Sequence, residues 1–299
     1  MQTGSGSVLL QNTRGLRAAR ETSSAFCYVE PLVRQDGEVQ TGFAFRMGPE
    51  ADDIEGCARE AVADALSRLC GAPVASGSYR VILKNTVMAE LLIAFSGMFS
   101  AEQAQKGCSL LADMEGRQIA ADCMTLLDDP FDPIAPRAFD GEGTPCQTKK
   151  IIDGGRFCTL LHNLKTAAKA GTESTGHAVR ASAASPVDIG PSILRLLPGA
   201  SGFDALVRRL GDGLIITDLQ GLHAGLNPVS GDFSLKATGR RVVNGTDTGA
   251  VNGVTLAGNF LTLMQNVTGV GSDVRFAAPS SCYAASPSVL VEQLQVAGK

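Results

Sequence analysis

The spacing of apolar and polar residues predicts where this chain forms helices and where it forms strands. Between residues 52 and 71, apolar side chains recur every three or four positions, and Asp52 and Asp53 stand at the start. This periodicity and the acidic first turn predict an amphipathic helix, which Gly71 and Pro73 would end. The residues expected on its buried face are Ala58, Val62, Ala65, Leu66 and Leu69.

Alternating apolar and polar positions on either side of this helix predict strands. Before it, the segments from Val8 to Val33 and from Val39 to Phe45 are interpreted as short strands, with a turn at Gln35 to Gly37. After it, the small, Pro- and Gly-bearing stretch 72–78 predicts a boundary, and a strand from Tyr79 to Leu83 follows.

The next predicted helix lacks a polar face. The stretch from Val87 to Phe99 is apolar almost throughout, and Asn85 or Thr86 is placed to cap its first turn. A helix that is apolar on all sides is buried inside a protein or in an interface.

The second half of the sequence is rich in predicted strands. These strands are 157–161, 214–218, 233–237 and 241–243. Asn244 and Gly245 follow the last of them and are a strong signal for a hairpin turn. Strands joined by tight turns pair antiparallel, so we predict an α+β fold whose C-terminal part is largely antiparallel β with few helices.

The C-terminal segment shows a strand, a short helix, a loop and a strand in that order. Asn259 is expected to cap the helix and Gly269 to end it. The residues expected on its apolar face are Phe260, Leu263, Met264 and Val267. In the closing strand the alternation breaks near Gln293, which predicts a kink.

Composition and charge narrow the classes of function. The formal charge is −4 and no cluster of Lys and Arg exceeds a pair, so the basic surface that nucleic-acid binding needs is missing. No apolar run approaches the ~20 residues that cross a bilayer, and the polar start is not a signal peptide. We therefore expect a cytoplasmic protein without a nucleic-acid or membrane partner, whose eight cysteines are reduced thiols.

Four sequence motifs occur in a fixed order along the chain. They are Phe-Asp-Gly-Glu-Gly-Thr at Phe139 to Thr144, Ser-Thr-Gly-His within 168–178, the Gly-rich stretch from Leu210 to Gly245, and Val254 to Lys299. Together they resemble the TldD/PmbA family, once called modulators of DNA gyrase and now regarded as subunits of a metallopeptidase. The resemblance runs from about Val8 to the last residue.

The resemblance implies a division of the chain into two parts. Residues 76–299 correspond to the β-rich C-terminal domain of the family, and residues 1–75 to the remnant of an α/β domain before it. Family members carry a further α/β region at the N-terminus, so the chain resembles an N-terminally truncated member.

The resemblance also bears on the metal. Metal-bearing members place His-Glu-x-x-x-His on the helix before an Arg/Lys-Gly-Ser segment, where imidazoles hold zinc and the carboxylate takes a proton from its water. Alignment on Lys106 and Gly107 puts Leu92, Ile93 and Gly97 at those positions. Because aliphatic side chains cannot bind zinc, the chain resembles the metal-free PmbA (TldE) branch, with no cofactor of its own and with zinc expected in a partner subunit.

A cysteine near the C-terminus completes the zinc site of the metal-bearing members. Cys282 lies in a comparable loop. Without ligands on the helix it is expected to be an unligated thiol.

The Ser-Thr-Gly-His loop supplies the residues that we predict to bind substrate. These are Ser174, Thr175, Gly176 and His177. The loop either lines a cleft for an extended peptide or is a turn whose hydroxyls bond to neighbouring backbone. A nucleophile made by Ser174 and His177 is not favoured, because no Gly-x-Ser-x-Gly surrounds it and residues three apart on a loop seldom form a productive bond. We predict no catalytic residue.

Two other groups of polar residues invite a metal-binding interpretation that we do not favour. Cys158 and His162 are four apart, but their segment reads as a strand running into a turn, where they would not converge. The cluster of Asp128, Asp129 and Asp132 could bind a cation, but its two prolines favour a solvated turn.

The sequence supports two functions from different classes. The preferred one is a non-metal subunit that lines a chamber for unfolded peptides, while a TldD-like metal-bearing partner supplies zinc and the catalytic glutamate. The alternative is a homodimeric, non-catalytic peptide-binding or scaffold protein. A third and weaker possibility is a self-sufficient metal enzyme that uses Cys158, His162 or Cys282.

Overall fold

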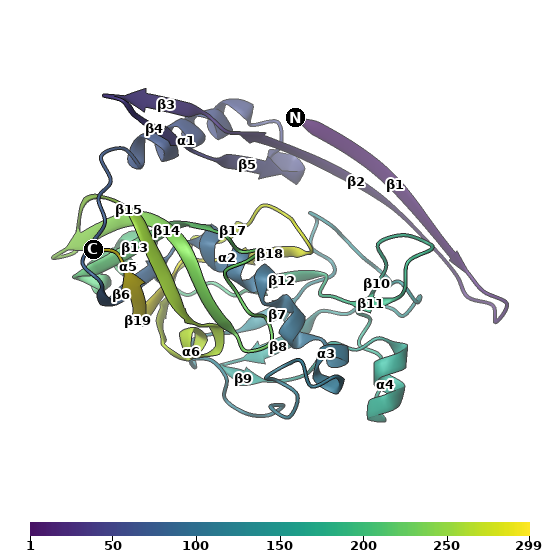
Figure 1. Ribbon diagram of the computed structural model, residues 1–299. Helices are drawn as coiled ribbons and strands as arrows, with labels where there is room; N and C mark the ends of the chain where they lie inside the picture. The colour runs from purple at the N-terminus through teal and green to yellow at the C-terminus, as the bar shows by residue number, and fades with distance from the viewer.

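Two six-stranded sheets with a helix between them form the body of the protein, and a separate N-terminal layer lies over them (Figure 1). The computed structural model describes residues 1–299. Sheet I contains, in spatial order, β15 (Thr246–Asn259), β14 (Asp232–Val243), β13 (Gly213–Gln220), β6 (Gly77–Leu83), β19 (Val289–Ala297) and β16 (Val267–Val270). Sheet II contains β17 (Arg275–Phe276), β18 (Tyr283–Ser286), β12 (Ile193–Leu196), β7 (Leu126–Asp128), β8 (Lys149–Asp153) and β9 (Arg156–Phe157).

Pairing in both sheets is antiparallel except between β6 and β13 and between β12 and β18. Asn244 and Gly245 both have positive φ, 50° and 71°, and form the tight turn between β14 and β15 that their sequence predicts. In β19 the register shifts between Val291 and Leu294, so the kink expected near Gln293 is present. The prediction of an α+β fold with a largely antiparallel C-terminal part is confirmed.

Helix α2 (Asn85–Ala94) lies between the sheets and contacts strands of both. It is buried, as the absence of a polar face predicts, and belongs to one continuous core with residues from the two sheets. It ends earlier than expected, because Ser96 and Gly97 are poor helix formers and the chain continues as the 3₁₀ turn η2 (Ser96–Phe99). The predicted cap was also wrong: Lys84 is the N-cap residue, and the Asn85 amide instead donates to the main-chain oxygen of Asp273 at 2.7 Å.

The remaining elements of the body are short. They are α3 (Ala101–Gln105), α4 (Leu164–Ala170), α5 (Phe203–Leu210), α6 (Phe260–Gln265) and the two-stranded pair β10 (Ala178–Val179) and β11 (Asp188–Ile189). Asn259 caps α6 as predicted, accepting from the N–H groups of Leu261 and Thr262. The helix ends before Val267, however, which begins β16 instead of extending the apolar face. No helix is long and apolar enough to cross a membrane.

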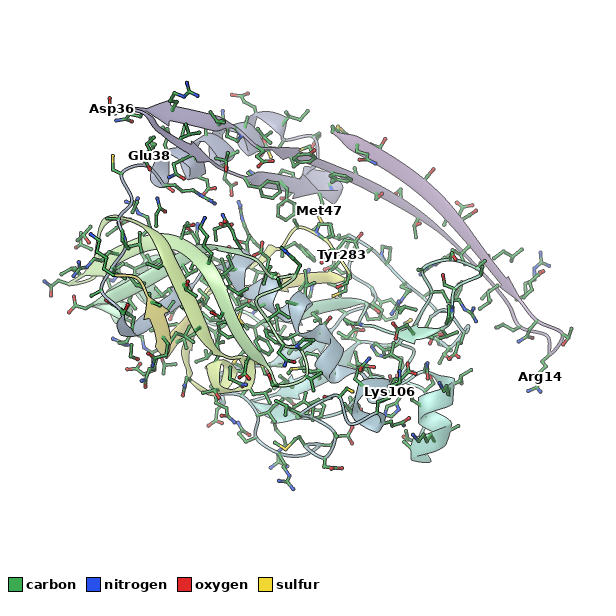
Figure 2. The ribbon with its side chains drawn as sticks, viewed as in Figure 1. Arg14, Asp36, Glu38, Met47, Lys106 and Tyr283 are labelled. Carbon is green, nitrogen blue, oxygen red and sulfur yellow. The ribbon has the colours of Figure 1, made fainter.

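The N-terminal layer consists of a small three-stranded sheet, which contains a long hairpin, together with a separate short hairpin, a helix and a 3₁₀ turn. Its elements are β1 (Gln2–Gln11), β2 (Arg17–Val29), β3 (Leu32–Gln35), β4 (Glu38–Thr41), β5 (Ala44–Met47), η1 (Gly48–Glu50) and α1 (Ile54–Ser67). The β1–β2 hairpin is longer than the sequence predicts and reaches past the body, with Arg14 at its tip (Figure 2). The turn between β3 and β4 lies at Asp36 and Gly37, as predicted.

Helix α1 begins where predicted, with Asp53 as its N-cap, but it buries a different face. Its buried residues are Cys57, Ala61 and Ala65, whereas Val62 and Leu66 are exposed. The reason is close backbone approach: a Cβ on Gly42 would lie 2.1 Å from the Ala61 oxygen, so only small residues fit on this face. The long apolar side chains therefore point away from the small sheet.

Gly42→Ala should separate α1 from the small sheet, because the added methyl group has no space against the helix backbone. We expect a loss of about 1–3 kcal/mol of unfolding free energy, measured by urea denaturation. Gly77→Ala is the matched control, since its Cβ would meet only the Tyr79 ring at 3.8 Å. Equal stability of the two variants would contradict this packing.

Candidate functional site

The Ser-Thr-Gly-His loop joins three segments of the chain by hydrogen bonds. The Thr175 hydroxyl accepts from the His162 N–H at 2.6 Å, and the Ser174 hydroxyl donates to the His162 oxygen at 3.3 Å. Gly176 has a φ of +76°, and a Cβ there would lie 2.8 Å from the Pro145 oxygen, so the position requires glycine. Ser174 and Thr175 are half-buried, whereas Gly176 and His177 are buried.

His177 is held from both sides of its ring. Nε2 lies 2.9 Å from Asp128 Oδ2, and Nδ1 lies 2.8 Å from the Thr175 hydroxyl. The other carboxylate oxygen of Asp128 accepts from the N–H groups of Ser192 and Ile193 at 2.6 and 3.1 Å. Both side chains are 1% exposed, so the pair is a fully compensated buried interaction between the loop and strand β7.

The order hydroxyl, imidazole, carboxylate in Thr175, His177 and Asp128 matches that of a catalytic triad, but its surroundings do not. The Thr175 hydroxyl is already bonded to the N–H and the oxygen of His162, and the imidazole is buried. A nucleophile needs free approach to a substrate carbonyl. This arrangement therefore fixes the loop in position, and Ser174 has no bond to the His177 ring.

The structure corrects the interpretation of the acidic cluster as a solvated turn. Asp128 and Asp132 are 1% and 3% exposed, because each has partners elsewhere in the chain. Asp132 forms an ion pair with Arg195 of β12, and Asp129 is partly exposed beside the same guanidinium. Local sequence gave no sign of these partners, which lie more than 45 residues away.

The turn from Phe139 to Thr144, another of the four family motifs, is hydrogen-bonded to the chain next to the Ser-Thr-Gly-His loop. In the turn from Phe139 to Thr144, Asp140 Oδ1 accepts from the N–H groups of Glu142 and Thr144, both at 2.9 Å. Asp140 Oδ2 accepts from the Ala178 N–H at 3.0 Å, next to His177. Two segments that are far apart in sequence thus form one hydrogen-bonded unit.

The end of helix α2 and the turn after it carry the positions that the resemblance aligns with the zinc motif. Leu92 and Ile93 are buried in the core, and a side chain at Gly97 would meet nothing within 4 Å. Burial raises the pKa of the Cys282 thiol, and the hydroxyls of Ser96, next to Gly97, and of Ser281 oppose this shift. Two aliphatic side chains and one missing side chain leave only a thiol and hydroxyls, which do not match the ligands of a zinc site.

The other proposed ligands are not clustered either. Cys158 is exposed and bonds to the Arg156 oxygen, whereas His162 is buried and burial lowers its pKa. No three His, Cys, Asp or Glu side chains in the protein are arranged to hold a metal ion.

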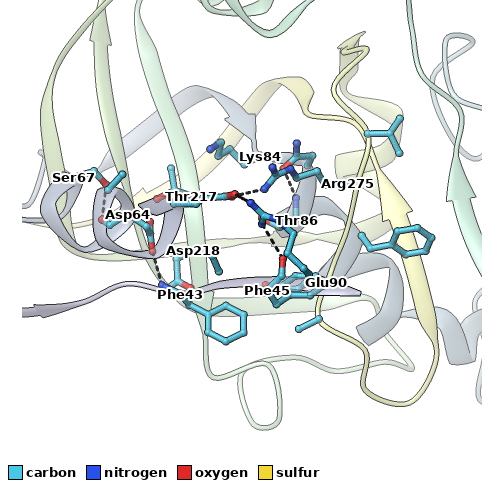
Figure 3. A pocket seen from close by; sticks show the side chains of 18 of the residues that line it. Phe43, Phe45, Asp64, Ser67, Lys84, Thr86, Glu90, Thr217, Asp218 and Arg275 are labelled. Carbon is cyan, nitrogen blue, oxygen red and sulfur yellow. Dashed lines mark hydrogen bonds and ion pairs between the residues drawn. The ribbon is translucent and has the colours of Figure 1, made fainter. Parts of the chain in front are cut away.

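A cavity of about 1290 Å³ lies between the N-terminal layer and the body, where the sequence had indicated no site (Figure 3). Phe43, Phe45 and Arg46 line it from the N-terminal layer, and Glu90 and Asp218 from the body. Ion pairs cross it, among them Arg68 to Asp218 at 3.4 Å. These contacts depend on packing between the layers, which no local pattern records.

Glu90, on α2, is a lining carboxyl group that has no hydrogen-bond or ion-pair partner. Burial, and secondarily the negative charge of Asp218, raises its pKa from 4.5 to about 7. Glu90 therefore gains or loses its proton near neutral pH, inside the cavity between the N-terminal layer and the body.

Comparison with known proteins identifies the family. The profile of the PmbA/TldA metallopeptidase C-terminal domain matches residues 76–298, and that of the central domain matches residues 2–69. The chain belongs to the PmbA/TldD family. Its resemblance to this family, inferred from the four segments, is therefore confirmed.

This PmbA/TldD chain is similar in sequence or structure to individual proteins named PmbA and TldE. It is 27% identical over 277 residues to the metalloprotease PmbA of Escherichia coli O157:H7, covering 90% of the chain and 57% of that relative. The crystal structure of TldE from Thermococcus kodakarensis aligns with a TM-score of 0.91 and 26% identity, over 99% of this chain and 68% of that one.

A candidate modulator of a DNA gyrase from Thermotoga maritima MSB8 has a similar structure, with a TM-score of 0.91 and 34% identity. That alignment covers 97% of this chain and 66% of the other. The chain thus spans about half to two thirds of the length of the relatives that it matches.

His177→Ala should destabilise the protein, because it leaves the buried Asp128 carboxylate without one of its donors. We expect a loss of about 3 kcal/mol in the free energy of unfolding, measured by urea denaturation at neutral pH. His223→Ala, at an exposed position, is the control and should change little. Equal effects of both substitutions would show that the pair contributes nothing.

Glu90→Gln should flatten the dependence of stability on pH. A carboxyl group whose folded-state pKa is raised binds its proton more tightly when folded, so its contribution is complete below pH 4.5 and is lost as the pH rises to about 7. Above pH 7 the Gln variant should exceed the wild type by on the order of 2 kcal/mol in unfolding free energy. The exposed substitution Glu173→Gln is the control, and a variant that is no more stable at pH 8 would refute the assignment.

Proposed function

We propose that the chain is a non-metal subunit of a PmbA/TldD-type metallopeptidase. In this role it lines the chamber in which unfolded peptide is held, and a metal-bearing TldD-like partner provides zinc and the catalytic glutamate. We place this activity in the cytoplasm. The family membership and the likeness to PmbA and TldE support the proposal.

The observation that carries the proposal is the composition of the α2 end. Leu92 and Ile93 occupy two motif positions as packed aliphatic side chains, and Gly97 leaves the third without a donor. With Cys282 as the one thiol that the resemblance adds, these aligned positions lack the imidazoles and the carboxylate of a zinc site. A chain with this composition needs another subunit for metal-assisted hydrolysis.

The Ser-Thr-Gly-His loop supports the peptide-binding part of the proposal. Its bonds to His162, Asp128 and the turn at Asp140 hold the wall of the chamber rigid, as a binding site requires. Ser174 and Thr175 are the members of the loop that reach the surface, and they are the ones that would contact an extended peptide.

Mixing the purified chain with a metal-bearing TldD-like subunit should produce zinc-dependent hydrolysis of an unfolded peptide, measured by mass spectrometry of the products. The chain alone should cleave nothing. A partner whose motif glutamate is replaced by glutamine is the control, because it keeps the assembly and removes the proton acceptor. Metal-dependent cleavage by this chain alone, or unchanged cleavage with the altered partner, would overturn the assignment; a homodimer that binds peptide without a partner would favour the scaffold function.

A further inference from the structure

Two arginine side chains near the Ser-Thr-Gly-His loop have no acidic partner. Arg20 belongs to strand β2 of the long hairpin, and Arg137 belongs to the segment that leads into the Phe139 turn. Neither forms an ion pair with any Asp or Glu of the chain, whereas Arg46, Arg68 and Arg195 each do. In both Arg20 and Arg137 the Nε atom is buried and has no hydrogen-bond partner. Buried donors without an acceptor are rare in proteins.

The two guanidinium groups are held in place by neighbours that do not neutralise them. The Arg20 guanidinium lies over the Phe139 ring, 5.8 Å from its centroid, and the Arg137 Nη2 donates to the Ser192 hydroxyl at 2.6 Å. The Cys146 N–H donates to the oxygen of Ala138, next to Arg137, at 2.9 Å, and the Cys146 thiol donates to the Gly176 oxygen at 3.3 Å. An aromatic ring and a hydroxyl thus position the two side chains, and Cys146 joins the Arg137 segment to the loop.

The positive charge at this place is uncompensated. Burial, and next the like charge of Arg137, lowers the pKa of Arg20. The nearest buried carboxylates are occupied, because Asp128 accepts from Ser192, Ile193 and His177, and Asp140 accepts from three main-chain N–H groups. Two neighbouring guanidinium groups without a counter-ion repel each other, and an anion bound by both would remove this repulsion.

We propose that Arg20 and Arg137 form a binding site for one oxyanion, a carboxylate or a phosphate. The planar guanidinium group presents its N–H donors as a fork that matches the oxygens of both anions, and each unsatisfied Nε–H would gain an acceptor. Because Arg20 lies on the hairpin and Arg137 on the body, the bound anion would also join the N-terminal layer to the body.

The position of the site favours a peptide carboxylate as the natural ligand, a refinement that rests on the proposed function. Ala138, next to Arg137, accepts from the N–H of Cys146, whose thiol bonds to Gly176 of the loop proposed to bind peptide. A peptide lying along this loop would place its C-terminal carboxylate between the two arginines. A phosphate group offers the same oxygens, so the experiment must separate the two sources.

Isothermal titration calorimetry of the full chain tests the site with three probes: inorganic phosphate, an unfolded pentapeptide with a free C-terminal carboxylate, and the same peptide as its amide. We expect binding of phosphate or of the free-acid peptide that falls about tenfold or more in both Arg20→Gln and Arg137→Gln. Arg14→Gln is the matched control, since it removes the same charge from the exposed tip of the same hairpin (Figure 2).

Preference for the acid over the amide would identify the peptide carboxylate, and binding of phosphate without that preference would identify a phosphate site. The proposal would be overturned if the wild type, Arg20→Gln and Arg137→Gln bound both anionic probes with the same affinity. It would also be overturned if Arg14→Gln lost as much affinity as these two variants. Thermal melts establish that the variants are folded, and the two variants lie on separate elements. Failure of peptide hydrolysis with a metal-bearing partner would leave these binding results unaffected, so the two ideas fail separately.

Discussion

The burial of helix α2 between the two sheets is the constraint on which the rest of the structure depends. Both sheets place their apolar faces on this helix, and the core that they share is continuous. Leu92 and Ile93, the two α2 positions that the resemblance aligns with the zinc motif, are therefore packing positions. In this chain they serve the core, which favours packing over metal binding there.

Buried charges in the protein fall into two groups with different consequences. Asp128 and Asp140 are satisfied by main-chain N–H groups and His177, and they lock β7, the Phe139 turn and β10 into one unit. Glu90 has no hydrogen-bond donor or cation as a partner, and Arg20 and Arg137 have no carboxylate partner. All three lie where the N-terminal layer meets the body. An uncompensated buried charge lowers stability, so its position marks where a ligand, a proton or a partner can contribute free energy.

Features that depend on local sequence were predictable. The Asn259 cap, the turn at Asn244 and Gly245, and the kink in β19 follow from the chemistry of a few adjacent residues. The buried face of α1 was predicted wrongly because hydrophobicity favours Leu66, whereas the approach of Gly42 admits only small residues. The burial of Asp128 and the environment of Glu90 depend on partners distant in sequence, which no local pattern reveals.

We propose that this chain has no zinc ligands of its own at the end of α2. Equilibrium dialysis of the purified chain against micromolar zinc, followed by elemental analysis, tests this proposal most directly. We expect zinc no higher than in the dialysis buffer, unchanged by Cys282→Ser. One zinc ion bound per chain and lost in Cys282→Ser would show a metal site at that position and contradict the proposal.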